Sequence, residues 1–133
     1  PHRCLTNFIL QLSGLDTLVN LEELYLQQNQ IKKIEGLNNN LQLETLDIAV
    51  NKIVKLEGLA HLPRLTELWI NWNAITDDTE NREYLKILKL KTIYLADNPV
   101  ANHDEYEEML KTAIPTLQQI DGNHLRLGGK FYH

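Results

Sequence analysis

The side chains that most often bind metals or act as nucleophiles are few and scattered in this sequence. Its 5 histidines and 1 cysteine share no short motif. The chain contains no Cys-x-x-Cys pair, His-Glu-x-x-His motif, glycine-rich phosphate loop or nucleophile elbow. We therefore predict that the protein is not an enzyme, and we expect no catalytic residues, no metal site and no cofactor. These dispersed residues are His2, Cys4, His61, His103, His124 and His133.

Two acidic residues and the cysteine have simpler structural explanations. The adjacent Asp77 and Asp78 could form a cation site, but such a pair more often marks the start of a solvated helix. Cys4 stands 22 residues before Leu26, at a position where leucine repeats. A packed thiol is therefore favoured over a reactive one.

A second group of residues suits recognition of a protein partner. Tyr25, Asp47, Trp69 and Tyr94 follow one another at intervals of 22, 22 and 25 residues, and Glu67 stands two residues before Trp69. Trp and Tyr are the residue types that most often anchor protein interfaces. Carboxylates beside them can meet Arg or Lys of a partner. Whether these side chains share a face depends on the elements that position them.

Charge and hydropathy exclude several classes of protein. The 133 residues include 13 Lys and Arg against 18 Asp and Glu, a net charge of −5, which disfavours nucleic-acid binding. No apolar stretch is long enough to cross a membrane, and no secretory signal opens the chain. A single cysteine cannot form an internal disulfide and fits a reducing compartment. We expect an intracellular protein that binds neither nucleic acid nor membrane.

An internal repeat indicates which elements hold the candidate residues. The pattern Leu-x-x-Leu-x-(Leu/Ile)-x-x-Asn-x-Ile begins at Leu21, Leu43 and Leu65, and a looser copy begins at Leu90. A partial copy around Asn7 precedes them. This is the leucine-rich-repeat pattern. Its asparagines are 22, 22 and 25 residues apart, at Asn29, Asn51, Asn73 and Asn98.

Each repeat is interpreted as a short strand, a turn and a returning segment. Leu24 and Leu26 point into the core, while Glu23, Tyr25 and Gln27 point outward. The asparagine amide is expected to pair with backbone groups at the turn, so the four repeated asparagines should stack as a ladder. We therefore predict an α/β leucine-rich-repeat solenoid. Its parallel sheet should line the concave face, with short helical, 3-10 or extended segments on the convex side and a C-terminal helical cap.

The chain is interpreted as a single domain that is N-terminally incomplete, because it enters in the middle of a repeat. Its expected parts are a partial repeat at 1–18, repeats at 19–102, a C-terminal cap at 103–127 and a tail at 128–133. The three extra residues between Asn73 and Leu90 favour a short helix capped by Asp78 or Thr79. A second helix is predicted over 103–111, with Asp104 near its N-cap.

The alternation of faces places the candidate binding residues on the outside of the sheet. Tyr25, Asp47, Trp69 and Tyr94 fall in one outward column, and Glu67 falls in the column beside it. Strand packing requires no aromatic row on a solvent face, so the row favours an interface. The rings could instead only support their cross-strand neighbours.

Several segments resemble the protein phosphatase 1 regulatory subunit 7 family. The resemblance runs from about Cys4 to Leu127 and is most specific in the last two repeats and the cap. It implies a non-catalytic regulator that binds the catalytic subunit of protein phosphatase 1 through its concave face, in the nucleus or cytoplasm. The segments are Leu-Asp-Ile-Ala-x-Asn at 46–51, Thr-Glu-Leu-Trp-Ile-Asn-x-Asn at 66–73, Thr-Ile-Tyr-Leu-Ala-Asp-Asn-Pro at 92–99 and Ile-Pro-Thr-Leu-Gln-Gln-Ile-Asp at 114–121.

The same resemblance implies roles for individual residues. By position, the binding carboxylates of the family fall on Asp47 and Glu67, and its binding aromatics fall on Trp69 and Tyr94. Trp72 departs from the family, where a small or acidic residue is expected, and its role is left open.

One alternative function remains at this point. The 22-residue repeat is shared with dynein light chain and with spliceosomal leucine-rich proteins, so the chain could be a structural adaptor of a motor or cytoskeletal complex. An RNA-associated adaptor would need a basic face, which the outward columns lack. The oligomeric state is left open.

Overall fold

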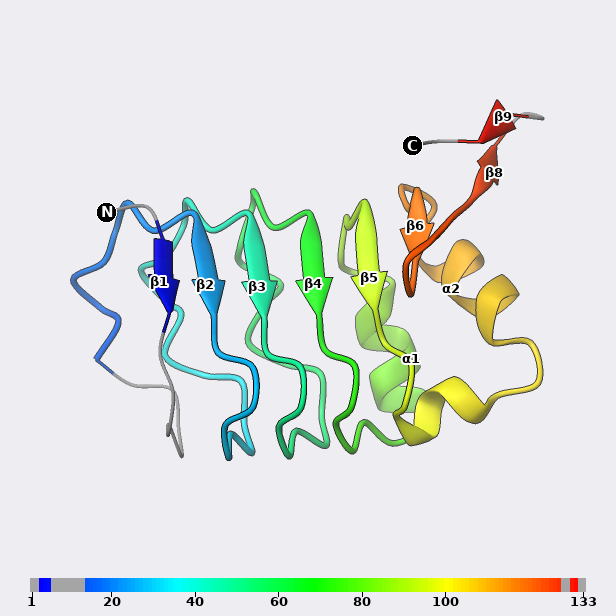
Figure 1. Ribbon diagram of the computed structural model, residues 1–133, viewed down its shortest axis with the longest axis horizontal. Helices are drawn as coiled ribbons and strands as arrows, with labels where there is room; N and C mark the ends of the chain where they lie inside the picture. Colours follow the sequence, from blue (N-terminus) through cyan, green and yellow to red (C-terminus); the bar gives the residue numbers. More distant parts are fainter. Residues whose placement is uncertain (1–2, 6–13, 128–129, 132–133) are drawn as a thin grey trace.

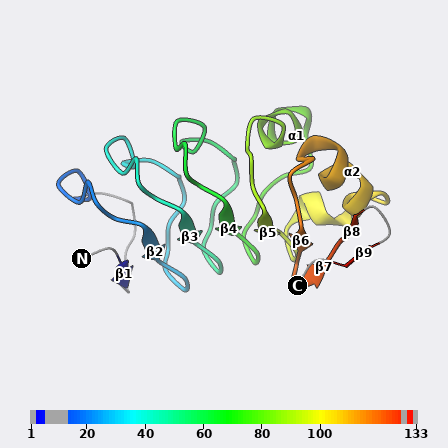
Figure 2. The same cartoon turned by 90° about the horizontal axis from the view of Figure 1, so that it is seen from above.

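The strands of successive repeats lie side by side in one curved sheet (Figures 1 and 2). The computed structural model describes residues 3–5, 14–127 and 130–131. Its 7-stranded sheet has the order β1 to β7, parallel from β1 to β6, with β7 antiparallel to β6. The predicted leucine-rich-repeat solenoid is confirmed. The strands are β1 (Arg3–Leu5), β2 (Glu23–Tyr25), β3 (Thr45–Asp47), β4 (Glu67–Trp69), β5 (Thr92–Tyr94), β6 (Gln119–Ile120) and β7 (Asn123–His124).

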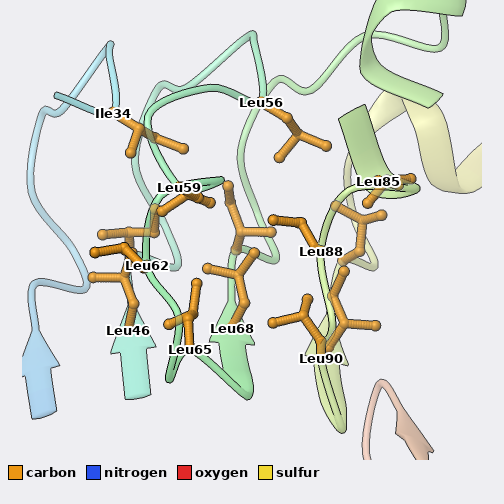
Figure 3. Close-up of a cluster of buried hydrophobic side chains, with 14 of the residues drawn as sticks. Ile34, Leu46, Leu56, Leu59, Leu62, Leu65, Leu68, Leu85, Leu88 and Leu90 are labelled. Atoms are coloured by element: carbon orange, nitrogen blue, oxygen red, sulfur yellow. The ribbon is translucent and has the colours of Figure 1, made fainter. Parts of the chain in front are cut away.

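The inward side chains of the strands form one continuous apolar core. Leu46 is aligned with Leu24 on one side and with Leu68 on the other, and all three are fully buried. Figure 3 shows leucines of the strands facing leucines of the returning segments, among them Leu56 and Leu59. A parallel sheet of three-residue strands is therefore held together by side chains that span neighbouring repeats.

The predicted asparagine ladder is confirmed. The Asn73 Nδ2 donates hydrogen bonds to Ile70 O (3.0 Å) in its own repeat and to Ile48 O (3.1 Å) in the preceding one. Its Oδ1 accepts a hydrogen bond from the N–H of Ile53 (3.0 Å). Asn51 and Asn98 repeat this arrangement. Each amide thus joins two successive repeats.

The backbone next to the ladder has a feature that the repeat pattern did not predict. The residue before each ladder asparagine has a positive φ: 59° at Gln28, 55° at Val50, 56° at Trp72 and 62° at Asp97. Gly58 in the returning segment also has a positive φ, of 70°. A Cβ at that glycine would lie 2.6 Å from Ile34 O, so a larger residue is excluded.

The convex side changes from turns to helix where the repeat is longer. Helix α1 (Thr79–Leu85) is capped by Asp78, whose side chain accepts a hydrogen bond from Asn81 N (2.8 Å). Of the two predicted caps, Asp78 and Thr79, the structure therefore has Asp78. The Tyr84 hydroxyl accepts hydrogen bonds from the N–H groups of Leu59 and Ala60, both at 2.9 Å. The helix of the longer repeat therefore supplies partners for the convex backbone of the preceding repeat.

A 3-10 helix η1 (Pro99–Asn102) and helix α2 (Tyr106–Ala113) follow the last ladder asparagine. The second helix was predicted to start at 103, but α2 begins at Tyr106; Asp104 lies next to the N-cap residue Glu105, which makes no side-chain capping hydrogen bond. The 3-10 turn delays the helix. At the junction, the His103 Nδ1 accepts a hydrogen bond from Glu105 N (3.0 Å).

The end of the ladder is closed by a carboxylate. The Asp121 Oδ1 accepts hydrogen bonds from Leu95 N (2.7 Å) and Ala96 N (2.9 Å). Its Oδ2 accepts one from the Tyr106 hydroxyl (2.7 Å). Burial and the neighbouring carboxylate raise the pKa of Tyr106 well above its ordinary value, so the phenol remains a donor.

The two ends of the chain complete the description. Beyond the cap, β8 (Arg126–Leu127) pairs antiparallel with β9 (Lys130–Phe131). The register of β1 pairs Cys4 with Leu24 and not with the Leu26 position that the 22-residue spacing predicted. The partial repeat around Asn7 lies outside the described residues.

Leu46→Ala tests the core. Because Leu46 is 0% exposed, we expect the free energy of unfolding to fall by about 2–5 kcal/mol, measured by chemical denaturation. Val54→Ala is the control, since Val54 is 47% exposed and should change stability by no more than about 0.5 kcal/mol. A loss below about 1 kcal/mol for Leu46→Ala would contradict this account of the core.

Asn73→Ala tests the ladder. The substitution leaves the N–H of Ile53 without its acceptor, and we expect a loss of about 1–3 kcal/mol in the free energy of unfolding. Asn38→Ala removes the same amide from an exposed position and should have little effect. Equal melting curves for the two variants would show that the ladder does not contribute to stability.

Candidate partner-binding site on the concave face

Four neighbouring strands bring the predicted site residues together on the outer face of the sheet. Tyr25 in β2 is aligned with Asp47 in β3, Asp47 with Trp69 in β4, and Trp69 with Tyr94 in β5. Glu67 lies two residues before Trp69 on the same strand. The strand register therefore confirms the predicted columns, while the binding role of these residues stays a prediction.

The two aromatic side chains at the C-terminal end of the row form a stacked pair. The ring centroids of Trp69 and Tyr94 lie 4.1 Å apart with an angle of 26° between the planes. The Trp69 Nε1 donates a hydrogen bond to the Glu67 carboxylate (2.7 Å). The indole is thus held on its face by tyrosine and at its edge by glutamate.

Glu23 belongs to the site although the sequence analysis did not select it. The Tyr25 hydroxyl donates a hydrogen bond to the Glu23 carboxylate, as Trp69 does to Glu67. The repeated spacing Glu-Leu-aromatic in β2 and β4 was the signal that could have identified it. Two carboxylates are therefore oriented by rings on their own strands.

Asp47 differs from the open carboxylate that its outward position suggested. Its strand neighbours on either side are Tyr25 and Trp69, and the residue is only 7% exposed. Its Oδ1 accepts a hydrogen bond from Ala49 N (3.1 Å). Burial raises the pKa of Asp47 above its ordinary value, with a smaller contribution from the negative charge of Glu67 and opposition from the Ala49 hydrogen bond.

The site is acidic as well as aromatic. The outward positions of β2 to β5 hold no Lys or Arg. Some cations away from this face form ion pairs, for example Lys55 with Glu80 (2.7 Å) and Lys86 with Glu83 (2.9 Å). The concave face can therefore offer apolar anchors and carboxylates to a cationic protein surface.

The part of the chain that the structure describes provides no support for a metal site or a membrane-spanning helix. No group of 3 or more His, Cys, Asp or Glu there is arranged to hold a metal ion. None of the helices in these residues has the length and apolar character needed to cross a membrane. A groove of about 400 Å³ lies between α1 and α2, and charged residues such as Arg82 and Glu108 line it.

Asp47→Asn tests the burial of the carboxylate. A raised pKa means that the folded state binds a proton more tightly than the unfolded state, so ionisation of Asp47 lowers stability. The ordinary pKa of an Asp carboxyl is 3.8. As the pH rises from this value through the raised pKa of Asp47, the free energy of unfolding of the wild type should therefore fall relative to that of the variant. At neutral pH we expect Asp47→Asn to melt at a higher temperature.

Thermal unfolding across this pH range provides the measurement, and Asp16→Asn at an exposed position is the control. The difference between wild type and Asp47→Asn should vanish in acid. A constant difference at every pH would contradict the pKa assignment.

Comparisons with known sequences agree with this architecture. The family described as Leucine Rich repeats (2 copies) matches residues 41–83. Protein phosphatase 1 regulatory subunit pprA of Dictyostelium discoideum is 43% identical over 65 residues, which cover 49% of this chain. The chain spans only 19% of the length of that relative.

Comparisons with solved structures show the same fold. A chain in the Drosophila melanogaster SNF/U2A′ complex aligns with a TM-score of 0.75 at 25% identity, covering 90% of this chain and 75% of that one. A chain in the Chaetomium Mex67:Mtr2 structure has a TM-score of 0.58 and 26% identity, with coverage of 67% and 60%. An internalin (inlF) from Listeria monocytogenes has a TM-score of 0.55 and 20% identity, with coverage of 90% and 46%, and shows the fold alone. The chain therefore has the leucine-rich-repeat fold, and 49% of it is similar to part of a regulatory subunit of protein phosphatase 1.

Proposed function

We propose that this domain is a non-catalytic protein-binding module that binds the catalytic subunit of protein phosphatase 1 through its concave face. The domain is built of leucine-rich repeats, and the similarity to pprA supports a phosphatase regulator. Within this proposal, the phosphatase contacts the row formed by Tyr25, Asp47, Trp69 and Tyr94, together with Glu67. The proposed locations are the nucleus and the cytoplasm.

The stacked pair of Trp69 and Tyr94 is the observation that supports this function most directly. Both rings lie on the outer face of the sheet and are half-buried. Their stacking and the hydrogen bond to Glu67 restrict their motion before a partner arrives. A restricted aromatic side chain loses little conformational entropy on binding, so its contact area contributes efficiently to affinity.

The carboxylates supply the second component of recognition. Glu23 and Glu67 are half-buried and oriented by neighbouring rings. A charge-assisted hydrogen bond from an Arg or Lys of the phosphatase to such a carboxylate is stronger than one between neutral groups. Attraction between the acidic face and a basic patch would also accelerate association and make it sensitive to salt.

Trp69→Ala tests the proposed function in a titration with the purified phosphatase catalytic subunit. We expect a loss of about 2 kcal/mol in binding free energy, because a central aromatic anchor commonly contributes that much. Such a loss weakens association roughly thirtyfold. The variant should remain folded, since the lost stack is worth about 0.5–1.5 kcal/mol of stability.

Val54→Ala is the binding control, because Val54 lies in a returning segment beside α1 and outside the concave face. It should bind the phosphatase as the wild type does. Unchanged affinity in a folded Trp69→Ala variant would contradict binding through this face. Wild-type protein that ignores the phosphatase but retains motor proteins would favour the adaptor function instead.

A further inference from the structure

A second outward surface lies where the strands end, beside the asparagine ladder. Its members are the four residues that precede the ladder asparagines, and adjacent repeats hold them side by side. The N–H of Val50 donates a hydrogen bond to Asn71 O (2.9 Å), and that of Trp72 donates one to Ala96 O (3.1 Å). We name this set the edge row: Gln28, Val50, Trp72 and Asp97.

Two members of the edge row are poorly suited to their backbone conformation. A positive φ is uncommon for residues other than Gly, Asn and Asp, and it is least expected for a β-branched or bulky side chain. Val50 and Trp72 nevertheless adopt it, and they are 43% and 59% exposed. Core packing therefore does not explain them. The repeat imposes a positive φ at all four positions, so the feature that core packing leaves unexplained is the choice of two exposed apolar side chains there.

The surface between the edge row and the stacked rings is formed mainly by small side chains. The outward residues there are Ala49, Asn71 and Ala96, of which two have only a methyl group. The buried Oδ1 of Asn71 has no hydrogen-bond partner among the residues that the structure describes. Because this oxygen is closed to solvent, it is not available to a docked segment, and the proposal does not depend on it.

Charge determines which segment fits. Asp97 is exposed and forms no ion pair with any residue in the described ranges. Asp97 follows Trp72 at one end of the edge row. The cation Lys52 lies two residues after Val50, nearer the other end of the row. A second copy of this chain, with its net charge of −5, would meet like charge here.

We propose that the edge row docks a segment of a protein partner in which an arginine or lysine is adjacent to an apolar side chain. The cation lies over the indole of Trp72 and pairs with Asp97, since a cation over a Trp face is attracted by the ring. The apolar side chain covers Val50. These contacts involve residues outside the concave-face columns, and they do not require that the partner be the phosphatase.

The chain has 2 tryptophans, so its two indole N–H resonances can report separately on Trp69 and Trp72. We would titrate the isotope-labelled full chain with two short synthetic peptides, one alternating Arg with Leu and the other alternating Glu with Leu. Trp72→Ala assigns the resonances. We expect the Arg–Leu peptide to shift the Trp72 resonance and the Glu–Leu peptide to leave it unmoved.

Asp97→Asn should weaken the Arg–Leu titration at the Trp72 resonance several-fold. Asparagine accepts a positive φ readily, so the variant should keep the fold. Asp104→Asn removes the same charge from an exposed site before α2 and should leave the Trp72 midpoint unchanged. The proposal is overturned if Trp72 responds to neither peptide or equally to both, or if Asp97→Asn and Asp104→Asn behave alike. Changes at Trp69 alone would concern the concave face and would overturn the edge-row proposal.

Discussion

The hydrogen bonds of the buried asparagine amides are the constraint on which the rest of this structure depends. Each strand has only 3 residues between β2 and β5, too few for a sheet to persist without support at its ends. The ladder supplies that support, because Asn51, Asn73 and Asn98 each bond to the backbone of two successive repeats. After the last ladder asparagine, Asp121 of the cap accepts hydrogen bonds from the N–H groups of Leu95 and Ala96.

The ladder also determines where the outward side chains lie. The ladder fixes the turn after every strand, so corresponding residues of adjacent repeats stay aligned. The stacking of Trp69 on Tyr94 depends on this alignment. The same turn forces a positive φ on the residue before each asparagine, which presents Val50 and Trp72 outward. One structural device therefore positions both the concave-face site and the edge row.

The convex side explains how the sheet tolerates a longer repeat. The step from Asn73 to Asn98 has three more residues than the others, yet Glu67 and Thr92 remain aligned. The longer repeat forms α1, in which Asn81 and Tyr84 bond to the backbone of the preceding repeat. Unpaired backbone groups there would be costly to bury. The length difference is thus absorbed on the side away from the candidate site.

The sequence alone determined the solenoid, the ladder and the outward columns, because these follow from a repeat length and from the alternation of side chains along a strand. It could not determine the burial of Asp47 or the stacking of Trp69 on Tyr94. Those features arise between strands whose residues are 22 or 25 positions apart, and they depend on how neighbouring side chains pack. The positive φ of Trp72 accompanies a hydrogen bond from its N–H to Ala96 O in the next repeat. Only the tertiary structure brings those distant groups together, and it thereby decides which outward residues are buried, stacked or exposed.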